Sequence, residues 1–411
     1  MFAGVSARVS DPELEFISVK YQPLFSLDEY QQRLYQTRQR MLEQGIDVLI
    51  VSEPANLYYL TGYDAWSFYT PQYALVSQDW DKPLCVVRGQ DVNGARLTSY
   101  LGDEHIIGYS DHYIQNPVAH CMAFIAELLR ERGKASSRIG YEGDSFFFSG
   151  RSLLQLQHHL PNATLVDADA LVNWVRSVKS DAEIGYMRQA ARLTELTMAR
   201  AIEKIKPGVR LADVAAEVYA SSVAGLEEYA GEYAAIAPLI PAGAGTSCPH
   251  VTWRDEVYKT GDCSTLEISG VKARYHAPQS RTVFLGQPNP RAYDTVQIVL
   301  EGIEAVLETA REGVYAHQVH AAWDAVISRH GIVKDSRCGY SIGIGYPPDW
   351  GERTISFRPI DNTLLTENVT MHFMPGVWFD DWGVAITESI RITKTGAECL
   401  CNTPRELFII D

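Results

Sequence analysis

A strongly marked helix start lies near the middle of the chain, at Ser180-Asp181-Ala182-Glu183. In this capping box the serine accepts from a helix N–H, and the glutamate reaches back to the N–H of the serine. Apolar residues follow at helical spacing until Pro207-Gly208 ends the helix. The patterns before and after this helix differ, and 411 residues exceed the usual size of one domain. We therefore expect two domains, at 1–175 and 176–411.

Short apolar strands alternate with helices in the first half. The expected strands are 46–51, 73–76, 83–87 and 138–141, and the expected helices are 28–45, 117–132 and 149–160. Such alternation is typical of an α/β domain. The first thirty residues carry two prolines and no clear period, so we expect them to form an arm.

Helices and strands occur in separate runs in the second half. Helices are expected at 211–224, 291–311 and 316–330, and strands at 263–270, 280–286, 369–374 and 384–393. This pattern predicts an α+β domain.

Charge and cysteine usage limit the class of protein. The formal net charge is −15, from 36 basic and 51 acidic residues, which argues against nucleic acid as a partner. No apolar run approaches the roughly 20 residues that span a bilayer, and the N-terminus has no secretion-signal pattern. Seven scattered cysteines favour a reducing compartment. We expect a cytoplasmic protein without membrane contact.

Two strands carry polar groups in mid-strand positions. In 263–270, Glu267 shares a face with Thr265 and Ser269, while apolar residues take the other face. In 369–374, His372 alternates in the same way. Each group is either functional or a satisfied structural group, and periodicity alone leaves both open.

A segment between these strands is dense in polar and aromatic groups. Residues 345–353 read GYPPDWGER, and such a loop is better explained by ligand contact than by packing, with a rigid surface turn as the alternative. Gly339-Tyr340-Ser341-Ile342-Gly343 matches a nucleophile elbow, but the following Pro347-Pro348 forbids the helix that this motif needs. We interpret it as a glycine-rich bend.

Several short motifs occur in the order of a known family. They are Lys179-Ser180-x-x-Glu183, Pro207-Gly208, Pro249-His250, Gly261-Asp262, 281–286 (RTVFLG) and Met374-Pro375-Gly376. With them, the chain from about residue 25 resembles the creatinase/prolidase/methionine-aminopeptidase family. The resemblance implies a creatinase-type α/β N-terminal domain and a pita-bread α+β C-terminal domain.

Most members of this family bind two metal ions through two aspartates, one histidine and two glutamates. Carried over to this chain, those positions hold Glu267, Pro278, Tyr340, Met374 and Thr387. Divalent metal ions prefer carboxylate oxygen or imidazole nitrogen, and one carboxylate cannot hold a pair of them. The resemblance therefore implies a site without metal or other cofactor.

A narrower resemblance is to metal-free members that open a small cyclic amidine bearing a carboxylate. It rests on 60–69 (LTGYDAWSFY), 88–91 (RGQD), 275–278 (YHAP), 345–353 (GYPPDWGER) and 372–375 (HFMP). It implies that Glu267 attacks the amidine carbon or activates water, and that His250 or His372 transfers a proton. The implied substrate-binding residues are Arg353 for the carboxylate, and Trp66, Phe68, Tyr346, Asp349 and Trp350 around the ring.

The family resemblance also implies a homodimer, in which the N-terminal domain, with Trp66 and Phe68, reaches the site of the partner. The expected partner besides this second copy is a small-molecule substrate. Three other functions remain open: a metal-dependent prolidase-like peptidase, a hydrolase of another small amidine or guanidine, and a non-enzymatic binding protein.

Overall fold

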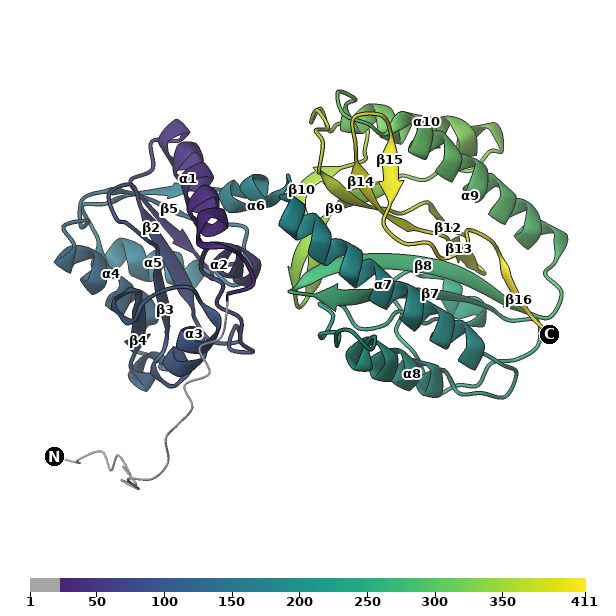
Figure 1. Ribbon diagram of the computed structural model, residues 1–411, viewed down its shortest axis with the longest axis horizontal. Coiled ribbons are helices and arrows are strands. Elements are labelled where there is room, and N and C mark those ends of the chain that lie inside the picture. The colour runs from purple at the N-terminus through teal and green to yellow at the C-terminus, as the bar shows by residue number, and fades with distance from the viewer. Residues whose placement is uncertain (1–22) are drawn as a thin grey trace, which may run out of the picture.

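The computed structural model describes residues 23–411, which form two domains that lie side by side (Figure 1). Most of the predicted arm falls on residues 1–22, outside the described residues. The α/β and α+β classes predicted for the two halves are confirmed. In the described part of the chain, no helix is both long and apolar enough to cross a membrane.

The N-terminal domain is built on a mixed six-stranded sheet of order β4-β3-β2-β1-β5-β6. Its strands are β1 (Val48–Val51), β2 (Tyr73–Ser77), β3 (Leu84–Arg88), β4 (Ile106–Tyr109), β5 (Arg138–Tyr141) and β6 (Thr164–Asp167). β1 is antiparallel to β2 and parallel to β5. Because the central strands are buried on both faces, they read as continuous apolar runs.

Helices cover this sheet. They are α1 (Leu27–Glu43), α2 (Pro54–Thr61), α3 (Val92–Thr98), α4 (Cys121–Glu131), α5 (Gly150–His159) and α6 (Leu171–Arg176). Helix α2 escaped the sequence analysis because it is buried all round and so shows no amphipathic period. The carboxylate of Glu142 accepts the N–H groups of Ser52 and Glu53 just before this helix, at 2.6 and 2.7 Å.

The C-terminal domain is built on an eight-stranded sheet and a small two-stranded sheet. The strands are β7 (Cys263–Lys272), β8 (Tyr275–Leu285), β9 (Gly339–Tyr346), β10 (Asp349–Ser356), β11 (Thr370–Phe373), β12 (Gly376–Trp378), β13 (Gly383–Ala385), β14 (Glu388–Ile392), β15 (Ala397–Cys399) and β16 (Phe408–Ile410). The longest pairing joins β7 and β8 from Cys263–Phe284 to Lys272–Tyr275.

Helices α7 (Asp181–Lys204) and α8 (Leu211–Ala224) run along β7 and β8, and α9 (Pro290–Thr309) and α10 (Ala316–Arg329) pack over the later strands (Figure 1). The capping box of Ser180 and Glu183 is present as predicted. The predictions of a bend at residues 339–343 and of a loop at 345–353 are wrong. These segments form the antiparallel β9–β10 hairpin, with Pro347-Pro348 at its turn.

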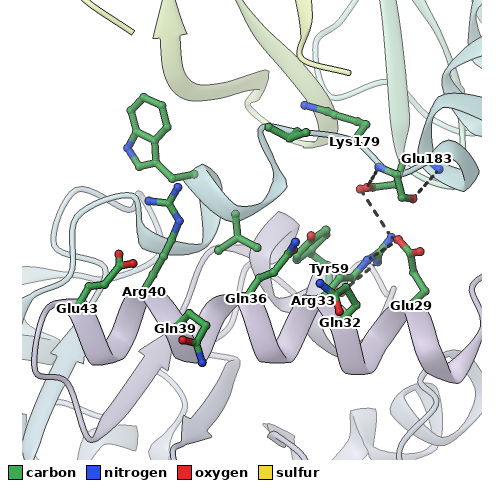
Figure 2. A pocket seen from close by; sticks show the side chains of 14 residues that line it. Glu29, Gln32, Arg33, Gln36, Gln39, Arg40, Glu43, Tyr59, Lys179 and Glu183 are labelled. Atoms are coloured by element: carbon green, nitrogen blue, oxygen red, sulfur yellow. Dashed lines mark hydrogen bonds and ion pairs between the residues drawn. The ribbon is translucent and has the colours of Figure 1, made fainter. Parts of the chain in front are cut away.

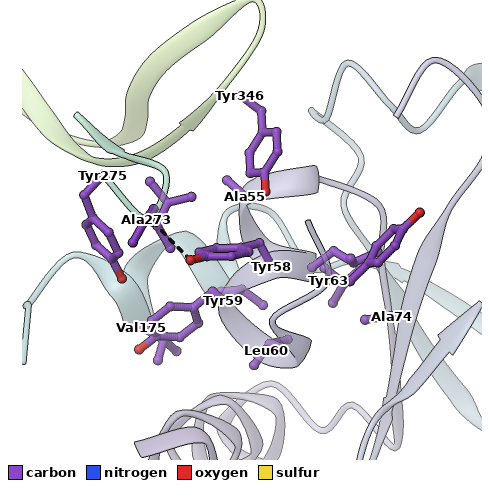
Figure 3. Packing of buried hydrophobic residues seen from close by; sticks show 14 of the residues in the cluster. Ala55, Tyr58, Tyr59, Leu60, Tyr63, Ala74, Val175, Ala273, Tyr275 and Tyr346 are labelled. Carbon is purple, nitrogen blue, oxygen red and sulfur yellow. Dashed lines mark hydrogen bonds between the residues drawn. The ribbon is translucent and has the colours of Figure 1, made fainter. Parts of the chain in front are cut away.

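The two domains share one apolar core (Figure 3). The Tyr58 hydroxyl of α2 donates to the Ala273 carbonyl at the β7–β8 turn, at 3.1 Å. Buried ion pairs border this core: Lys179 Nζ lies 2.6 Å from the Glu352 carboxylate, and Arg176 lies 3.7 Å from it. The domain-joining segment is thereby tied to β10.

Candidate active site

Glu267 stands in the middle of β7 with its backbone fixed from both sides. It is the register partner of Ser280 on β8, and on its other edge it exchanges two backbone hydrogen bonds with Leu239, at 2.9 and 3.1 Å. A strand held in this way leaves its side chain little freedom of direction. The predicted shared face is preserved, because Glu267 lies opposite Ser280 and Ser269 lies opposite Pro278.

Glu267 as a residue is partly buried, and its carboxyl group is surrounded by protein. Burial raises the pKa of Glu267 to about 7, and the Ser280 hydroxyl offsets part of that rise. Both the protonated and the charged form of Glu267 are therefore populated near neutral pH. Such a pKa suits a group that takes and returns protons.

His372 on β11 is fully buried and hydrogen-bonded at both ring nitrogens. Nε2 lies 2.7 Å from Oγ1 of Thr387, and Nδ1 lies 3.0 Å from the hydroxyl oxygen of Tyr340. Burial lowers the pKa of His372 to about 3, and the guanidinium of Arg337 adds to this effect. His372 is therefore neutral, with neither nitrogen free to reach a substrate.

Tyr340 on β9 is the hydrogen-bond partner of Nδ1 of this histidine. Its oxygen also accepts from the indole N–H of Trp350, at 2.8 Å. Burial and the charge of Glu267 raise the pKa of Tyr340 well above its usual value. The sequence analysis named Tyr340 as a replaced metal position and as part of the motif at 339–343, without giving it a role in the site.

Arg337 is a cation that the sequence analysis missed. Its guanidinium lies 4.3 Å from the centre of the Tyr340 ring, and Nη1 donates to the Ser356 hydroxyl at 3.3 Å. The side chain is exposed, so it retains N–H groups for a ligand. The signal that could have found Arg337 is its position in the sequence, shortly before Tyr340.

The residues at the family's metal positions do not suit a metal pair. Among residues 23–411, no three His, Cys, Asp or Glu side chains gather closely enough to hold an ion. Thr387 is occupied as a hydrogen-bond partner of His372 and of the Ser280 N–H. Glu388, the adjacent carboxylate, is turned away and binds Arg281 at 2.7 Å in a buried ion pair.

Three of the predicted substrate-binding aromatics lie together where the domains meet. The ring centroids of Trp66 and Phe68 are 4.9 Å apart, and those of Phe68 and Tyr346 are 5.8 Å apart. The Tyr346 hydroxyl donates to Asp64 at 2.7 Å, and Arg274 lies over the Tyr346 ring at 4.7 Å. Trp66 itself is 58% exposed.

The structure gives other predicted site residues different tasks. The guanidinium of Arg353 donates to the Asp144 carbonyl at 2.7 Å and to the Glu53 carboxylate at 3.4 Å, so it joins the two domains. These bonds compete with its predicted role at the substrate carboxylate, which stays a prediction. Trp350 is fully buried behind Tyr340, and so supports the site instead of lining it.

The remaining two predicted residues, Asp349 and His250, make no direct contact with Glu267 in the part of the chain that the structure describes. Asp349 accepts the N–H of Gly351 at 2.9 Å and shapes the turn of the hairpin, although its charge is felt by Tyr340. His250 lies exposed on a loop and has no hydrogen-bond partner among residues 23–411. The roles predicted for Asp349 and His250 therefore stay predictions.

A groove of about 590 Å³ lies elsewhere, between α1 and the segment that joins the domains (Figure 2). Its lining includes Glu29 and Arg33 of α1, and Lys179 and Glu183 at the start of α7. These charges pair with each other or with the protein around them: Arg33 lies 3.1 Å from Glu29 and 3.6 Å from Glu183. The groove holds none of the side chains bonded around Glu267 and Tyr340.

Comparison with known proteins identifies the family. Residues 33–178 match the creatinase/prolidase N-terminal domain, and residues 185–394 match metallopeptidase family M24. A recombinant prolidase from Thermococcus sibiricus superimposes with a TM-score of 0.80 at 19% identity, over 94% of this chain and all of that one. The chain belongs to the creatinase/prolidase family of two-domain proteins.

Two relatives are similar over nearly their whole length. An uncharacterized hydrolase/peptidase of Sinorhizobium fredii is 46% identical over 94% of this chain and 99% of its own. The ectoine hydrolase of Halomonas elongata is 42% identical over 94% of this chain and 98% of its own. The Xaa-Pro dipeptidase of Pyrococcus furiosus is more distant, at 25% identity over 92% of this chain and 99% of its own.

Proposed function

We propose that this protein is an ectoine hydrolase, which opens the cyclic amidine of ectoine to an N-acetylated 2,4-diaminobutyrate and so begins its breakdown as a nutrient. Hydroxyectoine belongs to the same substrate class. The observation that carries the proposal is Glu267, a carboxyl group with a pKa of about 7 among positions that have lost their metal ligands. The full-length likeness to the ectoine hydrolase of Halomonas elongata supports it.

The chemistry of the substrate fits a carboxylate acting without a metal pair. The ring carbon between the two nitrogens of an amidinium is already electrophilic. Glu267 forms the new bond at this carbon or deprotonates the water that does so, and either route needs one charged carboxylate. A prolidase-like reaction would instead need metal ligands where this chain has Pro278, Met374 and Thr387.

The carboxylate of ectoine needs a cation, and Arg337 is the candidate. It is exposed, lies against Tyr340, and influences His372, whereas Arg353 is engaged by Glu53 and Asp144. A guanidinium binds a carboxylate bidentately, which would orient the ring toward Glu267. Phe68, Tyr346 and Trp66 remain candidates for contact with the delocalised cation of the ring.

We also propose a homodimer in which Trp66 and neighbouring aromatics reach the site of the partner. Trp66, Tyr69 and Phe146 are 58%, 69% and 67% exposed, so these rings are available for contact with a partner. For the domain bounds we propose 1–175 and 176–411, which places the boundary at the end of α6. Seven unpaired cysteines are consistent with a cytoplasmic location.

The direct test is to remove metals from the purified protein, incubate it with ectoine, and identify the product by mass spectrometry. We expect a mass gain of one water and an acetylated diamino acid. Parallel incubations with a proline dipeptide and Mn²⁺, and with creatine, test the peptidase and guanidine alternatives. Cleavage of either of these, with ectoine untouched, would overturn the proposal, and so would no turnover at all.

A further inference from the structure

Ring opening requires a proton for the nitrogen that leaves, and the predicted donors do not meet this need. His372 is neutral and bonded at both nitrogens, and His250 is on an exposed loop with no partner in the described part of the chain. The inference below rests on the proposed function, and names the group that supplies the proton.

The hydrogen bonds around Thr387 and His372 fix where each proton points. The backbone N–H of Ser280 must donate to Oγ1 of Thr387, at 2.7 Å. If Nε2 of His372 also donated to Oγ1, the Thr387 hydroxyl would need another acceptor, and none is present for this buried group among residues 23–411. Thr387 therefore donates to Nε2, which leaves the ring proton on Nδ1.

The direction of the hydrogen bonds at Tyr340 follows from the same argument. The Nδ1–H of His372 then donates to the phenol oxygen at 3.0 Å, and the indole N–H of Trp350 donates to it at 2.8 Å. With two incoming hydrogen bonds, the phenol oxygen is fully used as an acceptor, and its own proton is left to point elsewhere. Among residues 23–411 no acceptor takes this proton, so the hydroxyl is available to donate to a ligand.

We propose that Tyr340 is the catalytic acid that protonates the departing ring nitrogen of the cyclic amidine. Thr387, His372 and Trp350 are positioning residues that aim its hydroxyl at the substrate. The phenol stays protonated across the working pH range, because burial and the nearby carboxylate both disfavour the phenolate.

The step balances when it is written for water as the nucleophile. Glu267 takes one proton from water, and the hydroxide adds to the amidinium carbon to give a neutral adduct. As the carbon–nitrogen bond breaks, its electron pair goes to nitrogen, which takes the Tyr340 proton. The hydroxyl of the adduct returns a proton to Tyr340 as the amide carbonyl forms, and the proton on Glu267 goes to the free amine. If Glu267 attacks directly, the leaving nitrogen needs the same proton.

The test compares Tyr340→Phe with the matched control Tyr258→Phe. Tyr258 is another buried tyrosine of the same domain, hydrogen-bonded to Ser264 at 3.3 Å. We expect Tyr340→Phe to lower kcat by about 10²-fold or more, with little change in KM, and Tyr258→Phe to retain the wild-type rate. A second variant carries a fluorinated tyrosine at position 340, which keeps the hydroxyl but lowers its pKa. In this variant we expect the decrease of kcat at alkaline pH to begin at a lower pH than in the wild-type protein.

The outcomes separate the two proposals. If the wild-type protein opens ectoine and Tyr340→Phe retains more than a third of its kcat, the assignment of the acid is overturned while the function stands. An alkaline limb that does not move with fluorination also overturns the assignment, even where Tyr340→Phe fails to fold. If the wild-type protein does not open ectoine, the proposed function fails and takes this inference with it.

Discussion

Glu267 and Ser280 face each other across β7 and β8, with the Ser280 hydroxyl as the polar neighbour that lowers the pKa of the carboxyl group. Burial outweighs that effect and raises the pKa to about 7. The charged form of Glu267 is therefore energetically unfavourable in its surroundings, as is common for carboxylates at catalytic positions. This affects both the pH dependence of activity and the stability of the folded protein.

The first prediction concerns pH. Since catalysis needs the charged form of Glu267, kcat/KM for ectoine should rise as pH increases through about 7, the pKa of this group. This limb would be read from initial rates between pH 5 and 9. An acid limb at pH 5 or below would contradict the assignment of Glu267.

The second prediction is the stability of the Glu267→Gln variant. The folded-state pKa of about 7 lies above the usual 4.5, so the folded form binds the proton more tightly than the unfolded form. The stability contributed by this group is complete below pH 4.5, and is lost as pH rises through 7. At pH 8 the variant should therefore be more stable than wild type, by on the order of 2–3 kcal/mol, with little difference at pH 5. Urea unfolding at both pH values measures this, and an equal difference at both would count against it.

The third prediction compares two arginines. Arg337→Ala should raise KM for ectoine about 10- to 100-fold, the loss expected for one charge-assisted hydrogen-bonding group. Arg353→Ala should leave KM near the wild-type value, because this side chain binds Glu53 and Asp144 across the domain boundary. Steady-state kinetics of both variants decide the matter. The reverse pattern would assign the binding of the substrate carboxylate to Arg353.

The fourth prediction concerns the buried pair of Lys179 and Glu352. Lys179→Met removes one partner of Glu352 and leaves Arg176, at 3.7 Å, as its remaining basic partner within residues 23–411. We expect the free energy of unfolding to fall by about 3 kcal/mol. Replacing both partners, as Lys179→Met with Glu352→Gln, should recover part of the loss. If the single variant is as stable as wild type in urea, the pair does not hold the domain-joining segment in place.

The fifth prediction follows from the proposed homodimer. Dilution to the monomer should abolish turnover, because the aromatics near Trp66 would no longer reach the other site. Light scattering gives the mass at each concentration, and the specific activity is measured alongside it. A monomer with full specific activity would show that the homodimer is not required for turnover.

Much of the fold is readable from the sequence where local signals are strong. The helix at 211–224 has the bounds predicted, and the capping box at Ser180 marks its helix correctly. The β9–β10 hairpin was missed because glycine and proline have low strand propensity, and pairing with β11 and β8 overrides it.

Part of the candidate site could be predicted from the sequence. Periodicity singled out Glu267 and His372, since both alternate with apolar neighbours on a strand. It could not show that both nitrogens of His372 are occupied, nor that Arg353 meets Glu53 from the other domain. Such pairings join residues far apart in the chain, so no local pattern records them. The role of Tyr340 emerged only from the hydrogen bonds of its neighbours.

The central claim is that a single carboxylate, without a metal pair, opens the ring. The most direct measurement is the rate of ectoine opening by wild type and by Glu267→Gln, both stripped of metal and checked by elemental analysis. We expect the wild-type protein to keep its full rate and the variant to lose about 10²- to 10⁴-fold, while still binding ectoine. A wild-type rate that vanishes with the metal and returns with two ions per chain, or a variant that works at the wild-type rate, would contradict the claim.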